Sequence, residues 1–313
     1  MLFKPALITF GHQNKIYETM KKIVLLFLSV IIIYSCGQNS DSNAIAALEE
    51  KLEASKDPKD AEALLAAYNE HLEDHPEDIM NARYLYRSAS TMWRMNRFGT
   101  ATEHLKRAIS EYYSSDNTPK AAELLSETYD NKLDNHGAAT SVRQAMLTAF
   151  PDYENMAKIQ DKMKADTLDF NGRMVQMSRD MFNPTTGRIN YRTANDFILN
   201  CELFTMVNPN GEANPGWLHR AAETARSIKN FDKAIELYKK IYNDYPDSDR
   251  APQAMFLHGF TLDNDLASFE EAKVQYDAFL KKYPDNDFAD DAQFLLDNLG
   301  KSEEELIRSF EKK

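Results

Sequence analysis

Apolar residues recur at intervals of three and four along much of the chain, which is the spacing that places them on one face of an α-helix. Near the C-terminus one such ladder occurs twice without a shift, at Phe231, Ala234, Tyr238, Ile241 and Pro246 and again at Phe269, Ala272, Tyr276, Phe279 and Pro284. A shorter version runs through Phe98, Ala101, Leu105 and Ala108. Such repetition predicts stacked helical units, each burying its apolar face against the next.

The ends of these predicted helices share a second pattern, an aromatic or imidazole ring followed by proline. It occurs at His75-Pro76, Phe150-Pro151, Tyr245-Pro246 and Tyr283-Pro284. Proline cannot continue a helix, and the ring can pack against the neighbouring unit. We therefore predict helical hairpins, with small alanines allowing close approach of the paired helices.

The middle of the chain follows the pattern less well. Turn sequences at 183–187 and 208–216 flank an apolar-faced segment, Tyr191 to Val207, which we predict to be a helix. We interpret residues 170–207 as a degenerate hairpin joining two blocks of repeats. The alternative is a hinge between independent domains.

The N-terminus resembles an export signal. Lys21 and Lys22 precede an apolar run, Ile23 to Tyr34, that is too short to span a bilayer, and small residues follow it. The run Ile33 to Gly37 resembles a bacterial lipobox, in which the cysteine, here Cys36, becomes the lipid-modified first residue of the mature protein. Residues 1–19 resemble neither signal nor domain, so we expect translation to start at Met20.

The ladders themselves resemble tetratricopeptide repeats (TPRs), most clearly between Trp217 and Leu299. This stretch is similar to repeats of bacterial envelope lipoproteins, a group that includes the lipoprotein of the outer-membrane β-barrel assembly machinery and the Tol–Pal-associated coordinator. The resemblance implies an all-α fold, an α-α superhelix in the form of a TPR-like solenoid of antiparallel hairpins. Between Gly259 and Ala272 the spacing is one residue longer than the family's, so we expect a distorted turn there.

The expected organisation has six parts. We predict a non-structural or mis-assigned extension at 1–19, a lipoprotein signal peptide at 20–35, the lipid anchor and tether at 36–45, N-terminal TPR-like repeats at 46–152, the connector with its degenerate hairpin at 153–214, and C-terminal TPRs with a capping helix at 215–313.

The net charge of the chain excludes some classes of binding partner. The chain carries a formal net charge of −12, and removal of residues 1–35, which hold four basic residues and one acidic residue, leaves −15. Such an acidic body lacks the clustered positive charge that nucleic acid requires, so we expect no nucleic-acid partner. It is not drawn to anionic lipid either, and membrane attachment would depend on the lipid on Cys36.

The sequence offers little support for a catalytic or metal-binding site. His71 and His75 could share a helix face as metal ligands, but the zinc-protease order is absent and His75 occupies the ring position of the repeat, so we interpret both as structural. Acidic residues at 285–291 lack the glycine and glutamate of a calcium loop. Cys201 lies in an apolar stretch and is interpreted as a buried thiol. We expect no metal, no cofactor, no catalytic residues and no enzyme.

A binding surface is expected on the first helix of each hairpin, since stacked hairpins line a groove with these helices. By the family positions of Leu85 and Leu218, the groove residues are predicted to be Arg83, Tyr86, Ser90, Trp93 and Arg94, and His219, Glu223, Arg226 and Ser227. Packing of Trp93 against the connector is an equal alternative. Asp166-Thr167-Leu168 resembles an O-glycan acceptor of Bacteroidetes-like envelope proteins, which makes Thr167 a candidate modification site.

These features together predict a lipid-anchored scaffold that binds envelope proteins or peptides. We expect it at the outer membrane, facing the periplasm, in outer-membrane biogenesis or envelope organisation. The alternative is a surface lipoprotein that captures glycan or peptide ligands.

Overall fold

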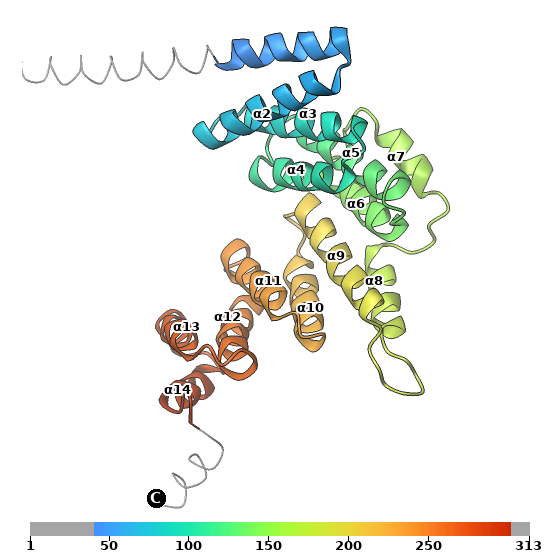
Figure 1. The fold of residues 1–313 in the computed structure, drawn as a ribbon. Coiled ribbons are helices and arrows are strands. Elements are labelled where there is room, and N and C mark those ends of the chain that lie inside the picture. Colours follow the sequence, from blue (N-terminus) through green and yellow to red (C-terminus); the bar gives the residue numbers. More distant parts are fainter. Residues whose placement is uncertain (1–40, 302–313) are drawn as a thin grey trace, which may run out of the picture. The chain divides into compact units, whose positions relative to one another are not determined.

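The computed structural model describes residues 41–301, and these form a succession of helices (Figure 1). Residues 41–55 are helical, including 41–45, which were assigned to the tether. The elements that follow are α2 (Pro58–Asp74), α3 (Asn81–Arg94), α4 (Phe98–Glu111), α5 (Thr118–Asn131), α6 (His136–Ala149), α7 (Met156–Met163), α8 (Phe170–Asp180), α9 (Tyr191–Val207), α10 (Asn214–Ser227), α11 (Phe231–Asp244), α12 (Arg250–Phe260), the π-helix η1 (Thr261–Asp265), α13 (Phe269–Lys282) and α14 (Ala289–Asp297).

The predicted all-α class of helical hairpins is confirmed. In residues 41–301 the only β-type pairing is an isolated bridge between Phe182 and Ile189, at the predicted turn 183–187. The chain divides into two compact units, one ending at Tyr84 and the other beginning at Leu85. None of the helices in the described part is long and apolar enough to cross a membrane. The predicted signal peptide and Cys36, the predicted lipidation site, lie outside the described residues.

In the first unit, the helix at 41–55 packs on α2. Ile45 and Leu52 are buried, as are Leu64 and Leu65 of α2. The Tyr68 hydroxyl donates a 2.6 Å hydrogen bond to Glu49, and Lys51 forms a 2.8 Å ion pair with Asp60. These contacts make a hairpin of the same kind as those in the second unit.

In the second unit the helices from α4 to α7, and again from α8 to α14, pack against their neighbours in the chain, and Figure 1 shows α10, α11, α12 and α13 following one another in this way. The connector belongs to the same stack, because α9 packs on α6 and α10 and also contacts α8. Arg173 of α8 donates to the carbonyl of Gly137 on α6 and to Asn200 on α9, which fastens the three helices together. The connector is thus packed against helices on both sides, and the degenerate hairpin stays a prediction.

The repeated ladder forms the core of the C-terminal hairpins. Ala234, Tyr238 and Ile241, and their equivalents Ala272, Tyr276 and Phe279, are fully buried. The ring residues at helix ends also repeat, since Phe150, Tyr245 and Tyr283 are C-caps whose backbone N–H bonds to the carbonyl four residues earlier. His75 adopts the same conformation at the end of α2. The proposed equivalence of these positions therefore holds at the level of the backbone.

The extra residue between Gly259 and Ala272 is accommodated by η1. Here α12 continues as a π-helix, and the N–H of Leu266 reaches the carbonyl of Thr261, five residues back, at 3.1 Å. A π-turn takes up one residue more than an α-turn without breaking the helix. The distortion expected from the spacing is thus a local widening and underwinding of the helix.

The tight turns within hairpins share one feature, a residue other than glycine in the left-handed region. The residues are Lys56, Asn96, Asp134, Lys229 and Ala267, with φ between 50° and 61°. Each lies two residues before the first residue of the next helix. The turn geometry therefore recurs even though the residue type does not.

Cys201 is fully buried in α9, next to the sulfur of Met174 at 3.9 Å. Burial raises the pKa of its thiol far above the ordinary range, so the thiolate is strongly disfavoured. The interpretation of Cys201 as a structural thiol agrees with this environment.

Candidate binding cleft

The first helix of the α10–α11 hairpin borders a cleft of about 560 Å³ in the second unit. Two of the four groove residues predicted on this helix, His219 and Glu223, line it. The other lining residues are Asn171, Glu212, Ala213, Pro215, Gly216, Trp217, Arg220, Ser248, Asp249, Arg250 and Gln253. The cleft is therefore built by α8, the start of α10 and the start of α12.

The start of α10 is fixed by the amide of Asn214. This amide donates to the carbonyl of Asn208 at 2.7 Å and to the hydroxyl of Tyr245 at 3.1 Å, so the C-cap ring of α11 holds the first turn of α10. Pro215 then pre-sets the helical φ of that turn. One turn further, the indole N–H of Trp217 donates to Asn171 of α8 at 3.0 Å. These bonds determine where the cleft residues of α10 lie.

Two guanidinium groups border the cleft. Arg220 lies over the ring of Trp217, 5.0 Å from its centroid, and Arg250 donates to Gln253 at 2.7 Å. Within residues 41–301 neither arginine forms an ion pair with a carboxylate. Most of their N–H donors therefore face solvent.

Glu223 is engaged differently from the arginines. Its carboxylate lies 3.3 Å from Nδ1 of His219, and this hydrogen bond, with smaller contributions from Arg250 and Arg220, lowers the pKa of Glu223. Nε2 of His219 is buried without a hydrogen-bond partner among the described residues. The cleft thus contains a carboxylate held in its charged form and two cations with spare donors.

Arg226 and Ser227, the other residues predicted on this helix, do not line the cleft. Arg226 pairs with Asp265 of η1 and lies over Phe260, 4.8 Å from its ring centroid. The hydroxyl of Ser227 bonds to the carbonyl of Glu223 in its own helix, at 2.8 Å. The structure gives Arg226 a role in holding the π-helical turn.

Most of the predicted residues of α3 contact neighbouring helices or their own helix. Arg83 lies 3.4 Å from Glu49 in the first unit. In the second unit the hydroxyl of Ser90 bonds to the carbonyl of Tyr86, and Arg94 is exposed. The ring of Trp93 packs edge-on against Phe98, and the Nζ of Lys132 lies 4.5 Å from the centroid of the Trp93 ring. Trp93 therefore contacts Phe98 of its own hairpin and Lys132 at the end of α5.

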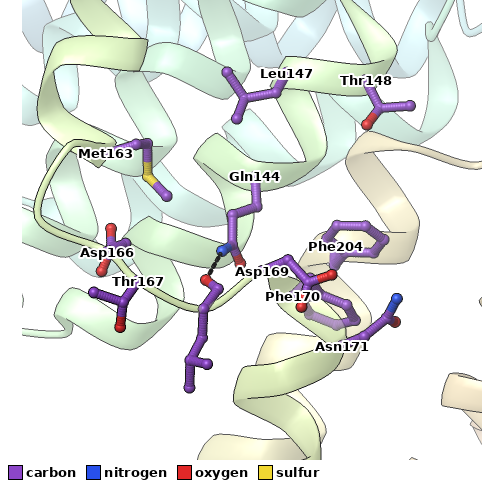
Figure 2. Close-up of a pocket in the computed structure, with 11 residues that line it drawn as sticks. Gln144, Leu147, Thr148, Met163, Asp166, Thr167, Asp169, Phe170, Asn171 and Phe204 are labelled. Atoms are coloured by element: carbon purple, nitrogen blue, oxygen red, sulfur yellow. Dashed lines mark hydrogen bonds between the residues drawn. The ribbon is translucent and has the colours of Figure 1, made fainter.

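A second cleft, of about 460 Å³, lies on the other side of Asn171 (Figure 2). Its walls are α6, the loop before α8, and α9, and Asn171 lines both clefts. Figure 2 shows Phe170 and Phe204 stacked at one end, with ring centroids 3.7 Å apart, and Asp166 with the exposed Thr167 at the other. Gln144 closes the loop by donating to the carbonyl of Leu168 at 2.8 Å. Modification of Thr167 stays a prediction.

Sequence reasoning missed Arg220, Arg250 and Asn171. Arg250 and Gln253 come from the next hairpin, and a register counted within one hairpin does not reach them. Asn171 lies in the degenerate region, where no repeat register exists. Arg220 precedes two ladder alanines, so counting positions beside the buried face of α10 would have found it.

Comparison with known proteins gives one family. The tetratricopeptide repeat model matches residues 218–248 and 253–286, which are the hairpins α10–α11 and α12–α13. No curated protein matches. Among solved structures the chain is similar to the "TPR2AB-domain:pHSP90-complex of yeast Sti1", with 16% identity, a TM-score of 0.33, and coverage of 82% of this chain and 98% of that chain.

Proposed function

We propose that this protein is a scaffold that binds protein partners through its second unit and is held at a bacterial envelope membrane by a lipid on Cys36. The matched repeats support the binding part, since their hairpins supply most of the cleft. Repeats of this kind use their stacked helices as recognition surfaces. The lipobox-like run at 33–37 supports the anchor. The outer membrane, facing the periplasm, and a role in envelope biogenesis or organisation are part of the proposal.

The observation that carries the binding function is the pair of guanidinium groups at the cleft. Arg220 and Arg250 lack carboxylate partners within the described residues, although the chain as a whole is strongly acidic. A guanidinium presents a planar fork of donors that fits a carboxylate with two parallel hydrogen bonds. The partner would therefore be a peptide segment that carries carboxylates.

Net charge alone does not select this partner. Glu212 and Asp249 also line the cleft, so the cleft carries both positive and negative charges. Hydrogen-bond geometry at the two arginines would give the specificity, while the carboxylates would exclude segments with misplaced negative charge. The adjoining cleft offers Phe204, which is only partly buried, to an apolar side chain of the same segment.

Glycan capture gains less support. Sugars bind through exposed aromatic faces, and Trp217 is only 8% exposed and covered by Arg220. Trp93 is half-buried and covered by Lys132. Neither tryptophan offers a free stacking surface.

The proposal is tested by photocrosslinking in cells. A photoreactive amino acid replaces Glu223, whose side chain is 56% exposed at the cleft. We expect protein adducts that disappear in the Arg220→Glu/Arg250→Glu variant. The matched control is Arg192→Glu/Lys281→Glu, which makes the same change in net charge at exposed positions away from the cleft. Absence of adducts, or adducts that survive the cleft variant, would contradict protein binding at this cleft.

A further inference from the structure

A histidine pair in the first unit lies next to a carboxylate. His71, on the last turn of α2, and His75, its C-cap, lie with ring centroids 4.8 Å apart. One ring nitrogen of each and one carboxylate oxygen of Asp41 lie within 4.8 Å of one another. Asp41 belongs to the helix at 41–55, so the three groups come from both helices of the hairpin.

The bonding of His71 leaves one nitrogen unused. Its Nε2 lies 3.0 Å from Asp78, and the carboxylate of Asp78 is itself held by accepting from the N–H of Met80 at 2.9 Å. Nδ1 is buried and has no hydrogen-bond partner among the described residues, and His71 as a whole is 3% exposed. An N–H at Nε2 facing Asp78 would leave Nδ1 with its lone pair free.

This arrangement is the one that metal-binding histidines adopt. A ligating imidazole usually donates its second ring nitrogen to a carboxylate, which sets the tautomer and orients the ring. His75 supplies a second nitrogen, and its Nε2 lies 3.3 Å from Asp41. The backbone of His75 is fixed because its carbonyl accepts from the amide of Asn81 at 2.7 Å. The ring of His71 and the backbone of His75 are therefore held in place before any ligand arrives.

We propose that Asp41, His71 and His75 form a binding site for a divalent cation of the zinc class. Two imidazoles and one carboxylate suit Zn²⁺, and three protein ligands leave a position for water. The side chains of Asp41 and His75 are 51% and 21% exposed, so the ion can enter and the outer ligands can adjust to ligand distances of about 2 Å.

The bound ion would join the helix at 41–55 to the end of α2. Asp41 lies only five positions after Cys36. The metal would thus fasten the first described residues of the chain to the hairpin that follows them. This inference concerns the first unit alone and does not depend on the binding cleft.

The test uses the full-length protein in detergent and Zn²⁺ alone, measured by titration calorimetry with metal analysis after dialysis. We expect one bound equivalent and a rise in melting temperature with added Zn²⁺. His75→Phe keeps a ring at the position where other repeats carry Phe150, Tyr245 and Tyr283, and should weaken Zn²⁺ binding by about 100-fold or more. Asp41→Asn, a near-isosteric change at a half-exposed position, should also weaken it.

The control is His136→Gln. His136 is an exposed histidine that faces two aspartates, Asp130 and Asp134, in the second unit. This variant should keep the stoichiometry and affinity of the wild type. The proposal is overturned if the wild type binds no equivalent, if His75→Phe and Asp41→Asn bind Zn²⁺ as tightly as the wild type, or if His136→Gln alone removes binding.

Discussion

Gly259 lies where α12 crosses α13, and its missing side chain makes room for Tyr276. A Cβ at this position would lie 2.9 Å from Cε1 of that ring, closer than van der Waals contact allows. The ring is fully buried and cannot move outward without opening the core. The contact explains a glycine inside a helix, where the residue is otherwise unfavourable.

We expect Gly259→Ala to destabilise the protein by about 1–2 kcal/mol, because overpacking outweighs the better helix propensity of alanine. Gly99→Ala is the control. A Cβ at Gly99, in the first turn of α4, meets nothing within 4 Å, so this change should be neutral or stabilising by up to about 1 kcal/mol. Urea unfolding of both variants measures the difference. Equal midpoints would mean that α12 and α13 do not cross this closely.

His258 is a buried histidine on α12 whose protonation opposes folding. Burial, with a smaller effect of Lys239, lowers its pKa to about 4, while in the unfolded chain it is 6.5. Nδ1 lies 3.2 Å from the hydroxyl of Tyr242. The folded protein therefore keeps this ring neutral between those two pH values, whereas the unfolded chain protonates it.

This difference makes stability depend on pH with a defined sign. The unfolded state binds more protons between pH 6.5 and about 4, so His258 lowers the free energy of unfolding as the pH falls through this window, by roughly 2–3 kcal/mol in total. Above pH 7 the effect is absent. Urea unfolding at several pH values should show a steeper loss for the wild type than for His258→Gln. Parallel curves for the two proteins would contradict the assignment.

At the scale of elements, a hairpin is a pair of helices whose small residues set the distance between them. Ala221, Ala222 and Ala225 of α10 and Ala234 of α11 are fully buried. Side chains this small let the two backbones approach, and the ring of Tyr238 packs in the same core cluster as these alanines. The alanines therefore determine the geometry more than the larger residues do.

We expect Ala234→Asp to cost about 3 kcal/mol or more, because it places a carboxylate without a partner between packed helices. Glu236→Asp, an exposed change on the same helix, should alter stability by less than about 0.5 kcal/mol. Thermal melting of both variants checks this. A melting temperature that barely moves in Ala234→Asp would show that the repeat register is wrong.

The elements could be predicted from the sequence because each depends on local periodicity. The ladder at Phe231 and Phe269 placed α11 and α13 correctly, and the single extra residue after Gly259 located the irregular turn. The form of that irregularity was not predictable. Spacing alone does not distinguish a π-helix from a longer loop.

The site was predicted only in part, since it depends on which hairpins meet. His219 and Glu223 line the cleft as expected. Arg226 does not, because η1 places Asp265 within reach of its guanidinium. The partner of Arg226 lies 39 positions later in the chain, and the repeat pattern carries no information about such a pair.

At the scale of the whole molecule, the proposed attachment to a membrane would have to overcome the negative charge of the protein. A mature chain beginning at Cys36 would carry a net charge of −15, which is repelled by anionic lipid headgroups. Each methylene of an acyl chain buried in the bilayer contributes about 0.8 kcal/mol to membrane binding, and two or more acyl chains hold a protein stably at a bilayer.

Cys36→Ser should therefore release the protein from membranes. We expect the wild type to incorporate an alkyne-labelled fatty acid and to sediment with membranes, and the variant to do neither. Labelling in cells followed by fractionation measures both. Cys201→Ser is the control, and it should keep the label because Cys201 is buried in α9. Unlabelled wild-type protein would exclude lipidation.

The residues in the left-handed region also mark positions where substitution could make the protein more thermostable. A side chain in that region costs about 1 kcal/mol, which glycine avoids, although asparagine and aspartate tolerate it better. Lys56, Lys229 and Ala267 are therefore the positions where glycine should raise the melting temperature most. The three turns lie in different hairpins, so the stabilising effects of the three substitutions should add. The natural sequence is therefore less thermostable than this fold allows.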